Sequence, residues 1–231
     1  MIMKRISILV AFIACTLFLS AQDVTKFLGI PVDGFKPEMK RALIAKGFTY
    51  DSANDCFEGE FNGNDVYVFI VTNNNKVCRI MLVDKNEISE TDIKIRFNNL
   101  CYQFERNLRY ERNSSESYVI PEAEDISYNI TVENKRYQAS YCQIPDSTKI
   151  DTRMIREECA QSWGLSSDDL NNLPEDKKKV FDSTVELKKN IMYLRNQMNN
   201  QVWFMIDERY GRYRILMYYD NGYNQADGED L

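Results

Sequence analysis

The spacing of apolar residues changes several times along the chain after residue 21. Between Pro37, which suits the first turn of a helix, and Gly47, a common helix stop, apolar positions follow a helical period and predict a helix over about 37–46. Alternating apolar and polar residues then predict three strands separated by asparagine-rich turns, namely 56–61, 66–72 and 77–83. The first half is therefore predicted to be a helix followed by an antiparallel meander.

The second half repeats this order. Ile93, Phe97, Leu100 and Phe104 recur at spacings of four, three and four residues, which predicts one face of a helix over about 90–107. After a polar loop, alternating patterns predict a hairpin and two late strands, over 126–132, 136–144, 202–207 and 212–219. The second half is thus also predicted to be a helix followed by antiparallel strands.

Residues 146–200 interrupt the second half with two helical patterns. A shorter helix is predicted over 151–163. A longer one, over about 175–199, carries a seam in which spacings of four and three alternate: Val180, Thr184, Leu187, Ile191, Leu194 and Met198. Two interpretations are open. The favoured one is that both helices cover one face of the sheet, and the other is that the seam is exposed and docks a partner helix.

These patterns predict an α+β fold built from two helix-plus-antiparallel-meander units, the second with a helical insertion. The expected division is a leader over 1–21, a first unit over 22–88 and a second unit over 89–231, with the insertion at about 146–200. No low-complexity stretch or internal repeat of solenoid type interrupts this order.

The amino terminus has the pattern of a signal peptide. Lys4 and Arg5 precede an apolar run, which ends at the small pair Ser20-Ala21, so cleavage after Ala21 is expected. Export to the periplasm or the exterior follows from this pattern. The alternative is a lipoprotein anchored through Cys15, although the apolar run continues past that cysteine. The mature chain carries no segment of membrane-spanning length.

Composition narrows the chemistry. The 231 residues include no histidine, which excludes Ser-His-Asp and Cys-His catalysis and histidine-ligated metals. The formal net charge is −6. The only charged residues in the leader are basic, so its removal makes the chain still more acidic, and a nucleic-acid partner is not expected. No phosphate-binding loop or metal motif is present, and no cofactor is predicted.

Five cysteines remain after the leader: Cys56, Cys78, Cys101, Cys142 and Cys159. An odd number in an oxidising compartment leaves at least one thiol unpaired. Their spacing matches no zinc site or redox motif. We therefore interpret them as small buried hydrophobic residues with either no disulfide or one disulfide among them. Their connectivity stays open.

Alternation along the predicted strands separates an apolar face from a second face that is rich in aromatic residues. Six side chains on this second face are candidate binding residues: Tyr67, Phe69, Trp203, Met205, Arg214 and Tyr218. The competing interpretation is that helices cover both faces, which would make these residues core. Asp207, at the end of an apolar run, is interpreted as a turn residue.

Several segments resemble uncharacterised secreted proteins of Bacteroides-type gut bacteria. They are Phe27 to Gly34, Lys46 to Asp51, Glu60 to Gly63, Val71 to Arg79 and Met217 to Asn221. The helix-then-meander order is also similar to that of β-lactamase-inhibitor-protein-like modules and of small lipoproteins of outer-membrane assembly, which are binding modules. The first resemblance implies secretion, and it draws attention to Ser52, in Asp51-Ser52-Ala53, as a candidate O-glycosylation site.

The sequence therefore favours a non-catalytic secreted binding protein of the bacterial envelope or exterior, with a protein or glycan as its partner. The alternative is a carboxylate-dependent glycan hydrolase, because a pair of carboxylates is sufficient for that chemistry.

Overall fold

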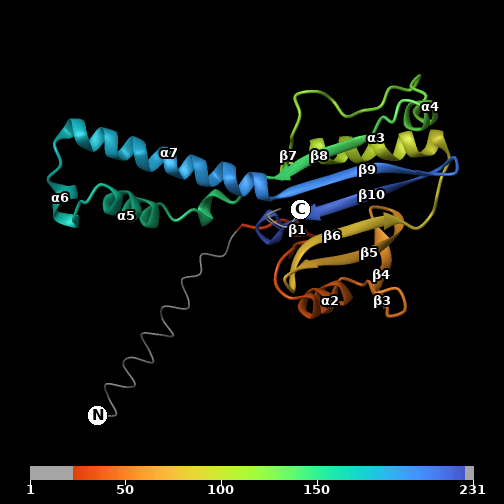
Figure 1. Ribbon diagram of the computed structural model, residues 1–231, viewed down its shortest axis with the longest axis horizontal. Coiled ribbons are helices and arrows are strands. Elements are labelled where there is room, and N and C mark those ends of the chain that lie inside the picture. The colour runs from red at the N-terminus through yellow and green to blue at the C-terminus, as the bar shows by residue number, and fades with distance from the viewer. Residues whose placement is uncertain (1–22, 227–231) are drawn as a thin grey trace, which may run out of the picture. The chain divides into compact units, whose positions relative to one another are not determined.

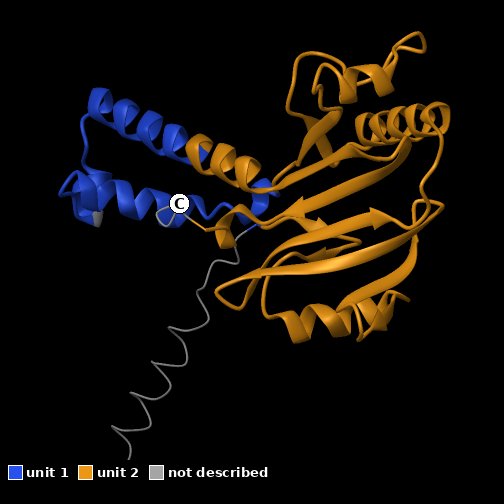
Figure 2. Cartoon of the chain, turned by 45° about the vertical axis from the view of Figure 1, so that its right-hand side comes forward, with its two compact units in different colours: residues 1–23, 146–189 blue, residues 24–145, 190–231 orange. Residues whose placement is uncertain are grey.

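The computed structural model describes residues 23–226, so the predicted leader and Cys15 lie outside the described residues. The described chain divides into two compact units (Figure 2). The larger one comprises 24–145 and 190–226, and the smaller one comprises 146–189 together with Asp23. The boundary predicted at 88/89 falls inside the larger unit, because elements on both sides of it share one sheet and one core.

The larger unit is built on an eight-stranded antiparallel sheet, with strand order β3-β4-β5-β6-β10-β9-β8-β7 (Figure 1). The strands are β3 (Thr49–Asp51), β4 (Cys56–Phe61), β5 (Asn64–Asn73), β6 (Lys76–Asp84), β7 (Tyr110–Arg112), β8 (Gln138–Gln143), β9 (Gln201–Arg209) and β10 (Arg212–Asp220). A separate two-stranded hairpin joins β1 (Lys26–Phe27) to β2 (Ile30–Pro31). Strands β6 and β10 pair side by side, which joins the two predicted meanders into one sheet.

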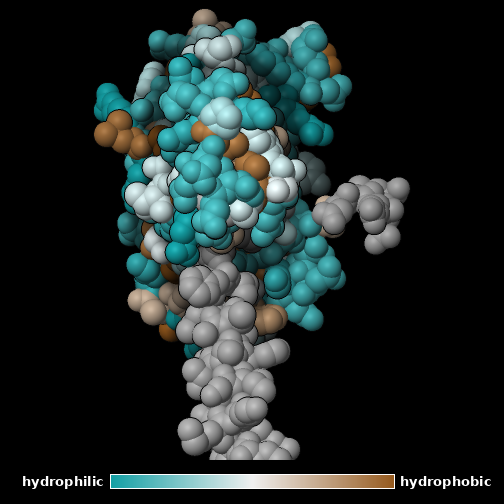
Figure 3. Space-filling model, turned by 90° about the vertical axis from the view of Figure 1, so that its left-hand side faces the viewer, coloured by the Kyte–Doolittle hydropathy of each residue, from teal (hydrophilic) through white to brown (hydrophobic). Residues whose placement is uncertain are grey.

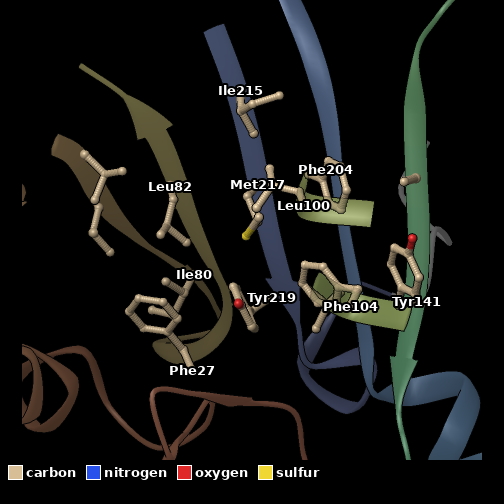
Figure 4. Close-up of a cluster of buried hydrophobic side chains, with 14 of the residues drawn as sticks. Phe27, Ile80, Leu82, Leu100, Phe104, Tyr141, Phe204, Ile215, Met217 and Tyr219 are labelled. Carbon is tan, nitrogen blue, oxygen red and sulfur yellow. The ribbon is translucent and has the colours of Figure 1, made fainter. Parts of the chain in front are cut away.

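Helices α2 (Lys36–Ala45) and α3 (Glu90–Arg106) pack on one face of this sheet and form its core. The predicted face of α3 is buried there, and Figure 4 shows Leu100 and Phe104 beside Phe204 and Tyr141 of the sheet. Ser89 caps the start of α3 by accepting a hydrogen bond from the Asp92 amide. A bidentate ion pair between Arg96 of α3 and Asp84 of β6, with N–O distances of 2.5 and 2.6 Å, attaches the helix to the sheet.

Two-residue turns connect neighbouring strands where the sequence predicts them. Asn62 and Gly63 have φ angles of 55° and 74°, and Asn74 and Asn75 have 49° and 65°. Positive φ at both central positions is the geometry of a type I′ turn, which asparagine and glycine adopt at low cost. Tyr210 and Gly211, between β9 and β10, share it with φ of 52° and 73°.

The predicted hairpin over 126–144 is wrong in its first arm. Residues Ile126–Thr131 form the short helix α4, and the Asp125 side chain caps it by accepting a hydrogen bond from the Tyr128 amide. Strand β8, the second arm, pairs with β7 and β9 instead. The β-branched residues of 126–132 favour a strand locally, but the N-cap formed by Asp125 and the burial of Ile126 against the core favour a helix.

The smaller unit contains the short η1 (Ser147–Lys149) and three helices, α5 (Thr152–Ser162), α6 (Ser167–Asn171) and the start of α7 (Glu175–Asn199). Its core joins Ile155 and Cys159 of α5 to Phe181 and Val185 of α7, and the Trp163 ring meets the Phe181 ring edge-on at 5.4 Å. Within the described chain, the helices all fall short of the length and apolar character that a membrane crossing requires.

The long helix forms over the predicted residues, but the favoured interpretation of its seam is wrong. The five large apolar residues of the seam are all more than half exposed: Val180, Leu187, Ile191, Leu194 and Met198. The buried residues of α7, Phe181 and Val185, lie on the neighbouring side of the helix. Figure 3 shows apolar side chains, in brown, reaching the surface among hydrophilic ones.

Candidate functional site

One face of the eight-stranded sheet carries neither α2 nor α3, and we call this the open face. Along β5, β9 and β10, buried residues that point to the core alternate with half-buried residues that point to the open face. All six candidate binding residues from the sequence lie on the open face and are half-buried. Helices α2 and α3 therefore leave uncovered the part of the sheet that these residues occupy.

The register aligns the open face into continuous rows across the strands. Phe69, Met81, Tyr218, Trp203 and Ser140 each stand directly opposite the next, on β5, β6, β10, β9 and β8. A second row, two residues along each strand, runs Tyr67, Val83, Leu216, Met205 and Gln138. The two rows place large apolar side chains side by side over four adjacent strands, β5, β6, β10 and β9, and end at the polar Ser140 and Gln138 of β8. The apolar residues span positions 67 to 218 of the sequence.

The centre of the open face is a stacked pair of rings. Trp203 and Tyr218 lie with ring centroids 4.0 Å apart and planes 17° from parallel. The indole Nε1 of Trp203 donates a hydrogen bond of 2.9 Å to Oδ2 of Asp220, which fixes the orientation of the ring. The rings are thus held in place before any partner arrives.

Arg79 completes this cluster from β6. Its guanidinium binds the Asp220 carboxylate at 2.5 and 2.8 Å, and its centre lies 5.0 Å from the Tyr218 ring centroid. The Asp220 side chain is only 7% exposed and the Arg79 side chain is 33% exposed, so the carboxylate is largely withdrawn from water while the guanidinium stays partly solvated. Burial raises the pKa of the Tyr218 hydroxyl, and the Arg79 charge opposes that rise.

Arg79 and Asp220 were missed by the sequence analysis. Asp220 ends a strand and precedes asparagine, which is typical of a solvated turn residue. Its importance depends on the register that sets Arg79 directly opposite it on the neighbouring strand. The only available signal was a basic residue near the start of one alternating segment and an acidic residue at the end of another.

Charged residues border the apolar centre of the open face. Arg214 of β10 binds Asp207 of β9 at 2.9 Å, so the interpretation of Asp207 as a turn residue is wrong. Lys85 lies 4.9 Å from the Tyr67 ring centroid and binds Glu58 at 2.8 Å. At one corner, the last turn of α7 approaches β7, where Gln197 donates to Glu111 at 2.6 Å.

The five described cysteines are all buried as free thiols. Burial raises the pKa of Cys101 to about 12, and burial also raises the pKa of Cys56, Cys78 and Cys142. A raised pKa leaves little thiolate near neutral pH, so these four side chains are poor nucleophiles and poor metal ligands. The interpretation as small buried residues agrees with this.

Ser52 lies in the exposed turn between β3 and β4. The Asp51 carboxylate shapes this turn by accepting hydrogen bonds from the Ala53 amide and the Asn54 side chain at 2.8 and 2.7 Å. Such a turn leaves the Ser52 hydroxyl accessible, and its O-glycosylation stays a prediction. Over the described residues, no group of three or more histidine, cysteine or acidic side chains is placed to hold a metal ion.

A cleft lies at one end of the sheet, and we call it the mouth cleft. Its volume is about 760 Å³, and its lining comes from the β1–β2 hairpin, the β4–β5 turn, the end of α3 and the adjoining ends of β7, β8 and β10. Glu60 is the one carboxylate among its lining residues.

Comparison with protein-family models, with curated proteins and with solved structures finds no match to this chain.

Proposed function

We propose that this protein is an exported, non-catalytic binding protein whose open face binds another protein. The observation that carries the proposal is the residue content of the open face, which is rich in tryptophan, tyrosine, phenylalanine, methionine and arginine over four adjacent strands, β5, β6, β10 and β9. These residue types are enriched at protein interfaces, where charged lysine and glutamate are confined to the rim. Lys85 and Glu58 occupy the border here in the same way.

The fixed geometry of the central rings favours binding. Trp203 is held by its stack on Tyr218 and its hydrogen bond to Asp220. A partner that covers this pair gains a large apolar area with little further loss of side-chain entropy. We expect Trp203 and Tyr218 to contribute more to affinity than the residues around them, as central aromatic residues generally do.

A glycan hydrolase is less well supported. That chemistry needs two carboxyl groups about 5 to 9.5 Å apart in a cleft, one of them a proton donor. The mouth cleft has Glu60 as the one carboxylate among its lining residues, and Asp207 and Asp220, which both lie on the open face, are each engaged by arginine.

The test is capture of a partner by purified protein from the native envelope fraction, followed by affinity measurement on the captured protein. We expect Trp203→Ala and Tyr218→Ala each to weaken that affinity by about 10-fold or more. Tyr102→Ala is the matched control, because Tyr102 is an exposed aromatic residue of α3 that lies away from the open face. A circular dichroism melt of each variant separates loss of binding from loss of fold.

Affinity that survives both substitutions in folded variants would overturn the proposal. Recognition of an immobilised glycan with the same dependence on Trp203 would replace the protein partner with a carbohydrate. Export itself is tested by the intact mass of the native protein, which should correspond to a chain that begins at Gln22. A diacylglyceryl mass on Cys15 would instead show a lipoprotein.

A further inference from the structure

The mouth cleft forms because residues from opposite ends of the strand order meet around α3. Asn62, at the β4–β5 turn, donates a hydrogen bond of 2.5 Å to Gln103 of α3. On the other side, the Gln143 side chain of β8 bonds both backbone groups of Lys26, at 2.8 and 2.7 Å. These contacts hold the β1–β2 hairpin and the β4–β5 turn as two walls of the cleft. A volume of about 760 Å³ is the size that holds a small organic molecule.

The floor of the mouth cleft is apolar and aromatic. Leu100, Phe104 and Tyr219, which Figure 4 labels, line it and are buried. Phe61 and Tyr110 are half-buried at its sides. A ligand that fills the cleft would therefore place an apolar body against these side chains.

The rim carries an unneutralised positive charge. Lys26 and Arg109 both line the cleft, and within the described chain neither has a carboxylate within ion-pair distance. Glu60 is the single opposing charge among the lining residues. A net positive cleft stands out in a chain with 35 acidic and 29 basic residues.

Arg109 is close enough for its charge to reach the floor. Burial raises the pKa of the Tyr219 hydroxyl, and the nearby Tyr110 hydroxyl raises it further, whereas the Arg109 charge opposes both effects. Gln143 also donates to the Tyr110 hydroxyl at 3.1 Å. Hydrogen-bond donors and a cation thus converge on one end of an apolar floor.

An energetically unfavourable turn forms part of the rim. Leu28 and Gly29 connect β1 to β2 with φ angles of 50° and 82°, the same turn geometry as Asn62-Gly63. Leucine has no local hydrogen bond to offset the cost of a left-handed conformation, whereas asparagine has. Leu28 is nevertheless 41% exposed and lines the cleft. Strained residues are frequent at ligand sites, so the position of Leu28 at the edge of the cavity agrees with a binding role there.

We propose that the mouth cleft binds a small organic anion with an apolar body, with the anionic group at Arg109 and Lys26 and the body on Leu100, Phe104 and Leu28. This ligand site is separate from the open face and goes beyond the proposed function. It requires no reaction.

Isothermal titration calorimetry of the whole protein with octanoate, octan-1-ol and octylammonium tests the two parts of the proposal. Octanoate should bind. Octan-1-ol should bind at least about tenfold more weakly, because it lacks the charge-assisted hydrogen bond of the carboxylate. Octylammonium should not bind, because its positive charge is repelled by Arg109 and Lys26. Affinity should rise by up to about fourfold for each methylene added between hexanoate and decanoate, because each methylene buries further apolar surface.

Variants locate the site. Arg109→Gln should weaken octanoate binding about tenfold or more, with Arg106→Gln as the matched control, since Arg106 is exposed in the last turn of α3 and does not line the cleft. Leu28→Asn should weaken binding while the melting temperature stays the same or rises, because asparagine tolerates the turn. Trp203→Ala should leave octanoate binding unchanged, which separates this site from the open face.

Three results would overturn the proposal. One is the absence of octanoate binding in the low millimolar range. The second is equal binding of octanoate and octan-1-ol, which would remove the anion from the assignment. The third is unchanged affinity in folded Arg109→Gln, which would place any bound octanoate elsewhere.

Discussion

Helices α3 and α7 carry the same kind of apolar pattern, but the large residues of the pattern are buried in α3 and exposed in α7. Both place large apolar residues at alternating spacings of four and three. In α3 the residues of this pattern are buried against the sheet, whereas in α7 the large residues of the pattern are more than half exposed. The comparison teaches that a period shows which side chains share a face of a helix, while the surroundings decide whether that face is covered.

The difference has an identifiable structural basis. Helix α3 is attached to the sheet by the Arg96–Asp84 pair, and its seam faces the buried side chains of β8, β9 and β10. Helix α7 packs on α5 through Phe181 and Val185, each one position after a seam residue. Successive residues of a helix are about 100° apart around its axis. The seam residues therefore point in a different direction from Phe181 and Val185, which follow them by one position and are buried.

The largest expected effect is in α3. Phe97 is 1% exposed and its ring meets that of Phe204 at 5.1 Å. Phe97→Ala should lower the free energy of unfolding by about 3 to 5 kcal/mol, because it removes apolar burial and leaves a cavity. Urea denaturation followed by circular dichroism measures this. A loss below about 1 kcal/mol would show that the α3 seam is not the main attachment of the helix.

Two valines of α7 provide a matched pair. Val185 is 3% exposed and Val180 is 58% exposed on the same helix. Val185→Ala should cost about 2 kcal/mol, whereas Val180→Ala should be neutral or stabilising by up to about 0.5 kcal/mol through helix propensity. Amide hydrogen exchange in α5 and α7 reads out the smaller unit directly. Equal effects of the two substitutions would contradict the assignment of the buried side of α7.

The third largest effect should come from alkaline pH, which should lower the free energy of unfolding through Cys101 of α3. Burial raises the pKa of Cys101 from 9.0, its ordinary value, to about 12 in the folded protein, so its contribution to stability is fully present below about pH 9 and is lost as pH rises toward 12. The loss is on the order of 1 kcal/mol at pH 10 relative to pH 8. Comparison of Cys101→Ala with the parent protein at both pH values isolates this contribution. An identical pH dependence in the two proteins would refute it.

The smallest effect should come from the α7 seam. Leu187→Gln combined with Leu194→Gln should change the free energy of unfolding by no more than about 0.5 kcal/mol, because both side chains are already exposed to water. Chemical denaturation at two protein concentrations checks this. A cost above about 1 kcal/mol, especially one that depends on protein concentration, would show that the α7 seam is covered in solution, as the α3 seam is.

The local elements of this fold could be predicted from the sequence alone. Helices α2 and α3, the strands from β4 to β6 and the pair β9–β10 match their predicted ranges, because capping residues, turn residues and period act within a few neighbours. The six residues of the open face were also found from alternation alone, since successive side chains of a strand point to opposite faces.

Tertiary structure decided what depends on distant partners. Whether 126–132 became a strand or a helix, which side of α7 was covered, and the pairing of β6 with β10 all depend on contacts that no local pattern contains. The same holds for the Arg79–Asp220 pair and for the approach of Lys26 and Arg109 to one cleft. Their positions depend on sheet register and curvature, because these features bring together residues that are far apart along the chain.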